Sequence, residues 1–209
     1  MGDDRGEGGG HQHGAQGRHG NPEDLEGYLA RLEGPDRAAW QKPDEVVAAL
    51  GLRPGDVAGE VGAGPGYFTL RLARAVGPEG RVHAIEVEPR MVEVLRARLA
   101  AAGLCNVQPL LAPAGDGLPP EPCRAILVVN TYHHFRDGAA YLHALAGRLA
   151  PGGRLVNVDF LPGPLPVGPG PEHKVSREDF LAAAARAGLA LVEERELLPY
   201  QYFLALAPR

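Results

Sequence analysis

Along the chain, the spacing of apolar residues changes repeatedly between two patterns. From residue 56 onward, short apolar runs such as DVAGEVG, RVHAIEV and RAILVVN are separated by segments in which apolar residues recur every three or four positions. Continuous apolar runs are typical of buried strands, and the longer period is typical of amphipathic helices. The pattern predicts strands at 56–62, 81–87, 106–111, 124–130 and 154–160, and helices at 66–76, 89–103 and 138–149.

The end of the chain departs from this alternation. Ser176, followed three residues later by Asp179, predicts the start of a helix that runs to about Gly188. Two further apolar segments, LALVEEREL and YQYFLALAP, are separated by Leu198 and Pro199 alone, so no crossover helix fits and they must form an antiparallel hairpin. We therefore predict an α/β fold: a doubly wound sheet of seven strands, the last antiparallel, with helices on both faces.

Three segments differ in composition. Residues 1–20 are rich in glycine and histidine and hold almost no apolar side chains, which predicts a disordered tail. Residues 21–50 are helical in pattern, with Pro43 suited to a first helical turn and Gly51 to a helix end. We expect these N-terminal helices to precede one main domain at 51–209.

The composition limits the partners of the protein. A chain of 209 residues with 44% apolar residues can bury one sizeable core, and its formal charge of −5 gives no reason to expect a nucleic acid partner. Cys105 and Cys123 show no C-x-x-C spacing, which argues against a disulfide framework or a zinc site and favours a reducing cytoplasm. No apolar run approaches the roughly 20 residues that span a membrane.

A glycine-rich turn, EVGAGPGYF, joins the first predicted strand to a helix. Such a turn lets a ligand approach backbone N–H groups at a helix N-terminus. Gly62, Gly64 and Gly66 are one residue short of the dinucleotide fingerprint G-x-G-x-x-G, and no Gly-Lys-Ser or Gly-Lys-Thr of a P-loop follows. Glu86 closes the second strand, where a carboxylate can accept both hydroxyls of a ribose. The alternative is a solvent-exposed acid at a strand end.

Over residues 36–209, the sequence resembles the class I S-adenosylmethionine-dependent methyltransferases. The resemblance rests on these motifs, on ILVVNTYHHF and LAPGGRLVNVDF, and on the terminal hairpin. The resemblance is closer to a bacterial subgroup with WQKP before the first strand and NTYHHF after the fourth. It implies a Rossmann-like methyltransferase sheet that binds S-adenosylmethionine and releases S-adenosylhomocysteine. The N-terminal helices, which include Trp40 and Gln41, would then cover the cofactor as a lid or make only a surface contact.

The resemblance also implies roles for single residues. The glycine turn would lie under the methionine part of the cofactor, Glu60 would support its amino end, and Glu86 would hold the ribose. Asp116 would meet the adenine amino group, and Asn130 would line the sulfonium region. The predicted cofactor-binding residues are Glu60, Gly62, Ala63, Gly64, Gly66, Tyr67, Glu86, Val87, Asp116 and Asn130.

The candidate catalytic residues follow the fourth strand. His133 and His134 lie at the carboxyl edge of the predicted sheet, where either imidazole can serve as a general base. The alternative is that one caps backbone groups while the other packs against the next helix. Tyr132 and His173 are candidates for substrate contact, His173 because its Pro/Gly-rich loop has the length of a functional loop. No metal site is expected.

The sequence thus predicts a methyltransferase that acts on a small molecule by in-line transfer, as a monomer or homodimer. Two alternatives stay open: an NAD(P)-dependent oxidoreductase and a nucleoside-binding module of the same fold without catalysis. The signature Asn/Asp-Pro-Pro-Tyr/Phe of adenine and glutamine N-methylation is replaced by Asn130-Thr131-Tyr132-His133. The acceptor atom is not fixed by the sequence.

Overall fold

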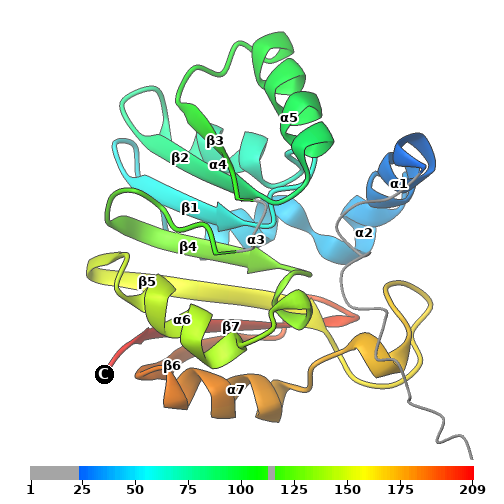
Figure 1. The fold of residues 1–209 in the computed structure, drawn as a ribbon, viewed down its shortest axis with the longest axis vertical. Helices are drawn as coiled ribbons and strands as arrows, with labels where there is room; N and C mark the ends of the chain where they lie inside the picture. The colour runs from blue at the N-terminus through cyan, green and yellow to red at the C-terminus, as the bar shows by residue number, and fades with distance from the viewer. Residues whose placement is uncertain (1–23, 113–115) are drawn as a thin grey trace, which may run out of the picture.

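The computed structural model describes residues 24–112 and 116–209 (Figure 1), so the predicted disordered tail at 1–20 lies outside the described residues. The helices are α1 (Leu25–Leu32), α2 (Arg37–Gln41), α3 (Pro43–Ala49), α4 (Thr69–Val76), α5 (Pro89–Ala101), α6 (Gly138–Ala146) and α7 (Arg177–Arg186), with short 3-10 helices η1 (Tyr132–His134) and η2 (Pro171–His173). The strands are β1 (Val57–Val61), β2 (Arg81–Glu86), β3 (Val107–Leu111), β4 (Cys123–Val129), β5 (Leu149–Phe160), β6 (Leu189–Arg195) and β7 (Gln201–Pro208).

The strands form one seven-stranded sheet in the order β3-β2-β1-β4-β5-β7-β6. The first five strands are parallel to one another, and β7 runs antiparallel to both β5 and β6. This arrangement confirms the predicted doubly wound sheet with a terminal hairpin. The reversal of strand order beside β1 places the carboxyl ends of β1 and β4 at the switch point, where such sheets bind ligands.

Helices cover both faces of the sheet and divide the core into two layers. On one face, α3 and α4 bury Val46, Leu72 and Val76 against β1 and β4. On the other, α6 and α7 bury Leu142 and Phe180 against β4, β5 and β7. Side chains point alternately to the two faces of a strand, so the apolar runs of β4 and β7 supply both layers.

One predicted boundary is wrong. We expected the fifth strand to begin at Arg154, after a helix ended by Pro151-Gly152-Gly153, but β5 begins at Leu149. The pairing register between β4 and β5 shifts between Cys123 and Ala125, so the Pro-Gly-Gly segment forms an irregular start of the strand. Gly153 is needed there because a Cβ would lie 2.7 Å from the carbonyl oxygen of Cys123.

Two segments lie beyond the carboxyl ends of the parallel strands. Figure 1 shows α1 and α2 on that side of the sheet, and the loop between β5 and α7 on the same side. The ring of Trp40 in α2 lies 5.9 Å from the ring of Phe160, the last residue of β5, between centroids. Gly168 of the loop sits so close to Phe160 that a Cβ there would lie 2.5 Å from its ring. Phe160 therefore anchors both segments over this edge.

Both cysteines are free, Cys105 exposed and Cys123 buried. Within residues 24–112 and 116–209, no helix has the length and apolar character needed to cross a membrane.

Candidate active site

The turn between β1 and α4 contains three glycines with positive φ. Gly62, Gly64 and Gly66 have φ angles of 77°, 53° and 96°, a region that other residues rarely adopt. A Cβ on Gly62 would lie 2.2 Å from Oγ1 of Thr131, and one on Gly66 would lie 2.6 Å from Leu95. Packing thus excludes side chains at both positions. A Cβ on Gly64 would meet nothing within 4 Å, so the space over the middle of the turn is open.

Glu86 ends β2 directly beside this turn and is 7% exposed. Its Oε2 accepts a hydrogen bond from the backbone N–H of Gly64 at 2.7 Å. Its Oε1 accepts from the N–H groups of Val87 at 2.8 Å and Glu88 at 3.0 Å. A carboxylate offers about four lone-pair positions, so these bonds fix its direction and leave capacity on Oε2 for a ligand hydroxyl.

An apolar surface continues from Glu86 along the edge of the sheet. Val87 is 38% exposed and Leu111, at the end of β3, is 46% exposed. Glu86 and Leu111 are paired residues of adjacent strands, so Val87 and Leu111 are close neighbours. Exposed apolar side chains at this edge suit a planar base. The sequence indicated Val87 but not Leu111. Asp116, the predicted partner of an adenine amino group, is exposed beyond β3.

Glu60 lies in β1 beneath the turn and is 3% exposed. Its Oε2 accepts a hydrogen bond from the hydroxyl of Thr69 at 2.5 Å. Burial raises the pKa of Glu60 to about 8; the Thr69 hydroxyl opposes that rise, the charge of Glu86 adds to it, and Arg37 lowers it. This carboxyl group is therefore a buried acid whose charge depends on positive groups nearby.

Arg37 reaches the same region from α2. Its guanidinium carbon lies 3.9 Å from the centroid of the Tyr67 ring, and that of Arg71 lies 4.7 Å from it. The hydroxyl of Tyr67 is buried and has no hydrogen-bond partner among the described residues. A buried polar atom without a partner is rare in a native structure, and this one lies at the predicted amino-acid end of the cofactor site. Arg37 was not indicated by the sequence pattern.

His133 is held by a buried carboxylate. Its Nδ1 lies 3.0 Å from each carboxylate oxygen of Asp159 in β5, and the two side chains are 6% and 1% exposed. The backbone N–H of Phe160 also donates to Asp159 Oδ1 at 2.9 Å. A carboxylate accepts only, so Nδ1 carries the proton and Nε2 carries the lone pair. His133 therefore makes a buried hydrogen bond to Asp159, a contact that the sequence pattern did not predict.

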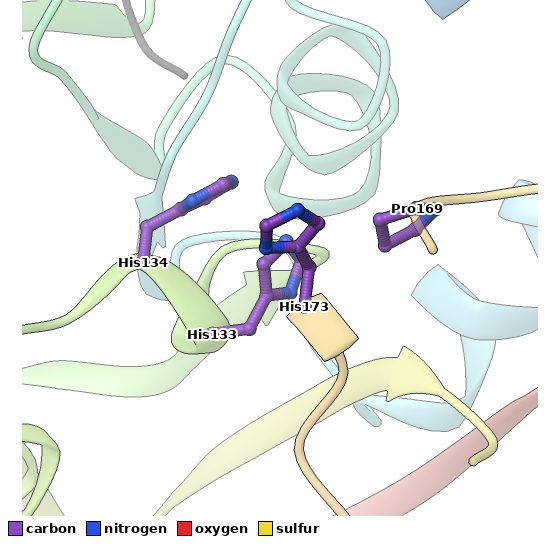
Figure 2. Close-up of a pocket in the computed structure, with 4 residues that line it drawn as sticks. All are labelled: His133, His134, Pro169 and His173. Carbon is purple, nitrogen blue, oxygen red and sulfur yellow. The ribbon is translucent and has the colours of Figure 1, made fainter. Parts of the chain in front are cut away.

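A cavity of about 90 Å³ lies beside this pair and is lined by His133, His134, Pro169 and His173. Figure 2 shows the imidazoles of η1 and η2 turned toward one another, with Pro169 on the far side. The rings of His133 and His134 are 4.1 Å apart between centroids, but His134 is exposed. The loop after β5 therefore brings His173 to the two histidines after β4. No group of His, Cys, Asp and Glu side chains in the described part of the chain could hold a metal ion.

Asn130 follows β4 with a φ angle of 53°. Its Oδ1 accepts a hydrogen bond from Nε2 of Gln201, and Oε1 of Gln201 accepts one from Nε2 of Gln41 at 3.2 Å. Gln41 and Gln201 are 0% and 3% exposed. Gln41 therefore makes a buried contact between α2 and β7, and the lid role of the N-terminal helices stays a prediction.

The predicted substrate contact of Tyr132 is wrong. Tyr132 is 7% exposed and belongs to the core, where its ring packs edge-on against Phe135 and Phe180. The chain turns into η1 after Thr131, which directs Tyr132 into the core and His133 toward the cavity. Asp159 and Gln201 are site residues that the sequence analysis missed. Their only signal was a polar residue within an apolar strand, such as Asp159 in RLVNVDF.

Residues 59–153 match a family model described as a methyltransferase domain. The protein-L-isoaspartate O-methyltransferase of Ignicoccus hospitalis is 45% identical over 75 residues, 36% of this chain and 36% of that protein. The catechol O-methyltransferase of Mycobacterium tuberculosis is 36% identical over 101 residues, 48% of this chain and 46% of that protein. The chain thus spans about half or less of the length of these curated relatives.

A solved structure covers more of the chain. The crystal structure of a SAM dependent methyltransferase from Aquifex aeolicus superposes with a TM-score of 0.78 and 25% identity. The superposition covers 86% of this chain and 96% of that one, so nearly the whole fold of that protein is present here.

Proposed function

Because the chain carries a class I S-adenosylmethionine-dependent methyltransferase domain, we propose that it methylates a small molecule whose acceptor group must lose a proton. The observation that carries this proposal is the pair of His133 and Asp159 beside the cavity. A buried carboxylate that orients an imidazole is the arrangement of a general base. A methyltransferase whose acceptor carries no proton has no need of one.

The cofactor of this family is S-adenosylmethionine, and the residues of the turn fit it. Gly64 leaves open space, Glu86 has capacity for ribose hydroxyls, and the hydroxyl of Tyr67 lacks a partner within the described residues. Gly62, Ala63 and Gly66 would shape the turn beneath the amino-acid end, and Glu60 with Arg37 would balance its charges. Val87 and Leu111 would flank the base. When bound, the cofactor supplies a methyl group on a sulfonium sulfur.

His133 acts on the acceptor. Its Nε2 has no hydrogen-bond partner among the described residues and belongs to the cavity lining. As the methyl group is transferred, Nε2 takes the proton of the acceptor, and the resulting imidazolium is stabilised by the Asp159 carboxylate 3.0 Å from Nδ1. Positioning of the acceptor in line with the methyl group supplies most of the remaining rate enhancement. His134 and His173 complete the wall around the acceptor.

The need for an acceptor that carries a proton distinguishes between two classes of methyl acceptor that the names of the relatives suggest. The carboxylate of an isoaspartyl residue is already ionised at neutral pH and requires no base. A catechol hydroxyl has a pKa well above 7 and does require one. The cavity is also small, about 90 Å³, and Pro169 and His173 form part of its wall. Both features favour a small hydroxyl- or amine-bearing molecule over a protein chain.

Of the alternatives, a nicotinamide-dependent oxidoreductase is not supported, because the matched domain is a methyltransferase domain. A nucleoside-binding module without catalysis is separated from the proposal by experiment. The lid role of α1–α3, the cytoplasmic location, and a monomeric or dimeric state stay predictions.

The test uses radiolabelled S-adenosylmethionine and a panel of phenols, alcohols, amines and carboxylates. The wild type should bind the cofactor and label members that carry an ionisable proton. His133→Asn and Asp159→Asn should lose turnover while retaining cofactor affinity. His143→Asn is the matched control, because His143 is an exposed histidine of α6 whose Nδ1 contacts the Ala187 carbonyl. Labelling of carboxylates alone would contradict the proposal.

A further inference from the structure

A chain of hydrogen bonds runs from α2 to the end of β4. The Nε of Arg37 donates to Oε1 of Gln41, Nε2 of Gln41 donates to Oε1 of Gln201, and Nε2 of Gln201 donates to Oδ1 of Asn130. The four residues come from α2, the start of β7 and the residue after β4. Gln41 and Gln201 are almost fully buried. Water therefore does not replace any link within this chain.

The donor-to-acceptor direction of these hydrogen bonds is fixed by Arg37. A guanidinium group has donors only, so Gln41 must turn its oxygen toward Arg37 and its NH2 group toward Gln201. Gln201 must then turn its oxygen toward Gln41 and its NH2 group onward. Amide orientations are normally ambiguous, but reversal of any amide here would place two donors or two acceptors face to face. Asn130 consequently accepts from Gln201 and keeps its own NH2 group for another partner.

That NH2 group lies at the carboxyl edge of β4. Asn130 is partly exposed, and its Nδ2 has no partner within residues 24–112 and 116–209. Asn130 also holds a left-handed φ of 53°, a conformation that residues other than glycine rarely adopt. The bond from Gln201 and the backbone bond from Asn130 N–H to the Val158 carbonyl at 2.9 Å hold it in this position.

We infer that this series of hydrogen bonds makes Asn130 a hydrogen-bond donor to the methyl acceptor. Asn130 would thereby select an oxygen nucleophile over an amine. The inference rests on the proposed function and narrows its substrate class to a hydroxyl group, such as a phenol. An oxygen nucleophile uses one lone pair to attack the methyl carbon and has a second that accepts from Asn130. A neutral amine nitrogen has a single lone pair, so it cannot attack and accept at once. Gln41 and Gln201 are positioning residues.

Atoms and electrons balance in the methyl transfer to the hydroxyl oxygen. The bond from the acceptor oxygen to the methyl carbon forms as the carbon–sulfur bond breaks, and its electron pair stays on the sulfur, which becomes a neutral thioether. The hydroxyl proton passes to Nε2 of His133. Asn130 stays a donor throughout and changes no bond.

Reversing the hydrogen bonds from the Gln41 end tests the inference without substituting Asn130 or His133. Gln41→Glu presents a carboxylate to Arg37, which can pair with it, and offers only an acceptor to Gln201. Gln201 must then reverse, Asn130 must donate to Gln201, and the Asn130 oxygen must face the site. Gln41→Leu, which breaks the chain without reversing it, is the matched control.

Side-chain NH2 exchange with water, measured by NMR on the cofactor-free protein, shows the direction. In the wild type, the Gln201 NH2 pair should exchange at least about tenfold more slowly than the Asn130 pair. In Gln41→Glu, this order should reverse, and Gln41→Leu should not protect the Asn130 pair. A protected Asn130 pair in the wild type, or an unchanged order in Gln41→Glu, would overturn the inference. The wild-type measurement decides the direction even if the variant does not fold.

The selectivity is measured with 2-aminophenol, which offers a hydroxyl and an amine in one molecule. The wild type should form the O-methyl product predominantly, and Gln41→Glu should lower the ratio of O-methyl to N-methyl product by about tenfold or more. An equal ratio in the two proteins would refute the selectivity of Asn130. Absence of both products would count against the proposed function and its selectivity, while the exchange rates would still decide the direction of the chain.

Discussion

Replacing Glu60 with glutamine should change how the stability of the protein depends on pH. Burial raises the pKa of Glu60 from 4.5 to about 8 in the folded protein. In the unfolded chain, the same carboxyl group ionises near its ordinary value. Between these two pKa values the folded state therefore holds a proton that the unfolded state has lost. Folding takes up that proton, so the free energy of unfolding of the wild type falls as the pH rises through this window.

The magnitude follows from the proton linkage. One proton contributes about 1.4 kcal/mol for each pH unit, so the loss between pH 5 and pH 8 amounts to roughly 4 kcal/mol. Glutamine has nearly the same shape, and its amide oxygen can still accept the hydroxyl of Thr69, which donates to Glu60 at 2.5 Å. Glu60→Gln removes the titrating group and should keep the packing.

The assay is urea unfolding of the wild type and Glu60→Gln at intervals from pH 5 to pH 9. The free energy of unfolding of the variant minus that of the wild type should rise by about 1.4 kcal/mol per pH unit and level off above pH 8. Thr69→Val removes a hydrogen bond that lowers the pKa of Glu60, so the levelling should move to higher pH. A difference that stays flat between pH 5 and pH 8 would refute the assignment of Glu60 as a buried neutral acid.

Four further substitutions, at three positions, test the site. Glu86→Ala should weaken S-adenosylmethionine binding by about 1.5–3 kcal/mol in calorimetry, because it removes the ribose acceptor and its bond to the Gly64 N–H; unchanged affinity would disprove the ribose role. Gly64→Val should abolish cofactor binding, since the valine side chain would enter the open space over the turn. Gly64→Asn should also abolish binding, in a protein with near-normal melting, because asparagine tolerates positive φ. Normal cofactor binding by Gly64→Asn would make the turn purely structural. His134→Asn should lower turnover in proportion to folded protein only, because Asp159 pairs with His133 and His134 is exposed. A stable His134→Asn protein that binds cofactor without turnover would contradict that expectation.

The sheet and the glycine turn were predictable from local patterns. Apolar runs, the gap of two residues in the hairpin and the capping Ser176 are all features of a few neighbouring residues. Ser176 does accept from the Asp179 N–H, as the sequence predicts. Glu86 at the end of the second strand was found for the same reason.

The partners of His133 and Asn130 were not predictable. His133 meets Asp159 because β4 and β5 are neighbours, and Asn130 meets Gln201 because β7 inserts beside β5 rather than after β6. Both contacts depend on strand order and on register, which a single sequence does not reveal. Tyr132 was misplaced for a similar reason, since the turn at η1 decides which of two adjacent side chains enters the core.

We propose that His133 serves as the base of a methyltransferase that acts on a proton-bearing acceptor. Single-turnover transfer of the labelled methyl group from bound S-adenosylmethionine to the first acceptor found in the panel tests this role. The wild type and His133→Asn are compared at saturating cofactor. We expect a rate about 10²–10⁴-fold lower in His133→Asn, with cofactor affinity unchanged and His143→Asn equal to the wild type. Equal rates in the wild type and in a folded His133→Asn protein would contradict it.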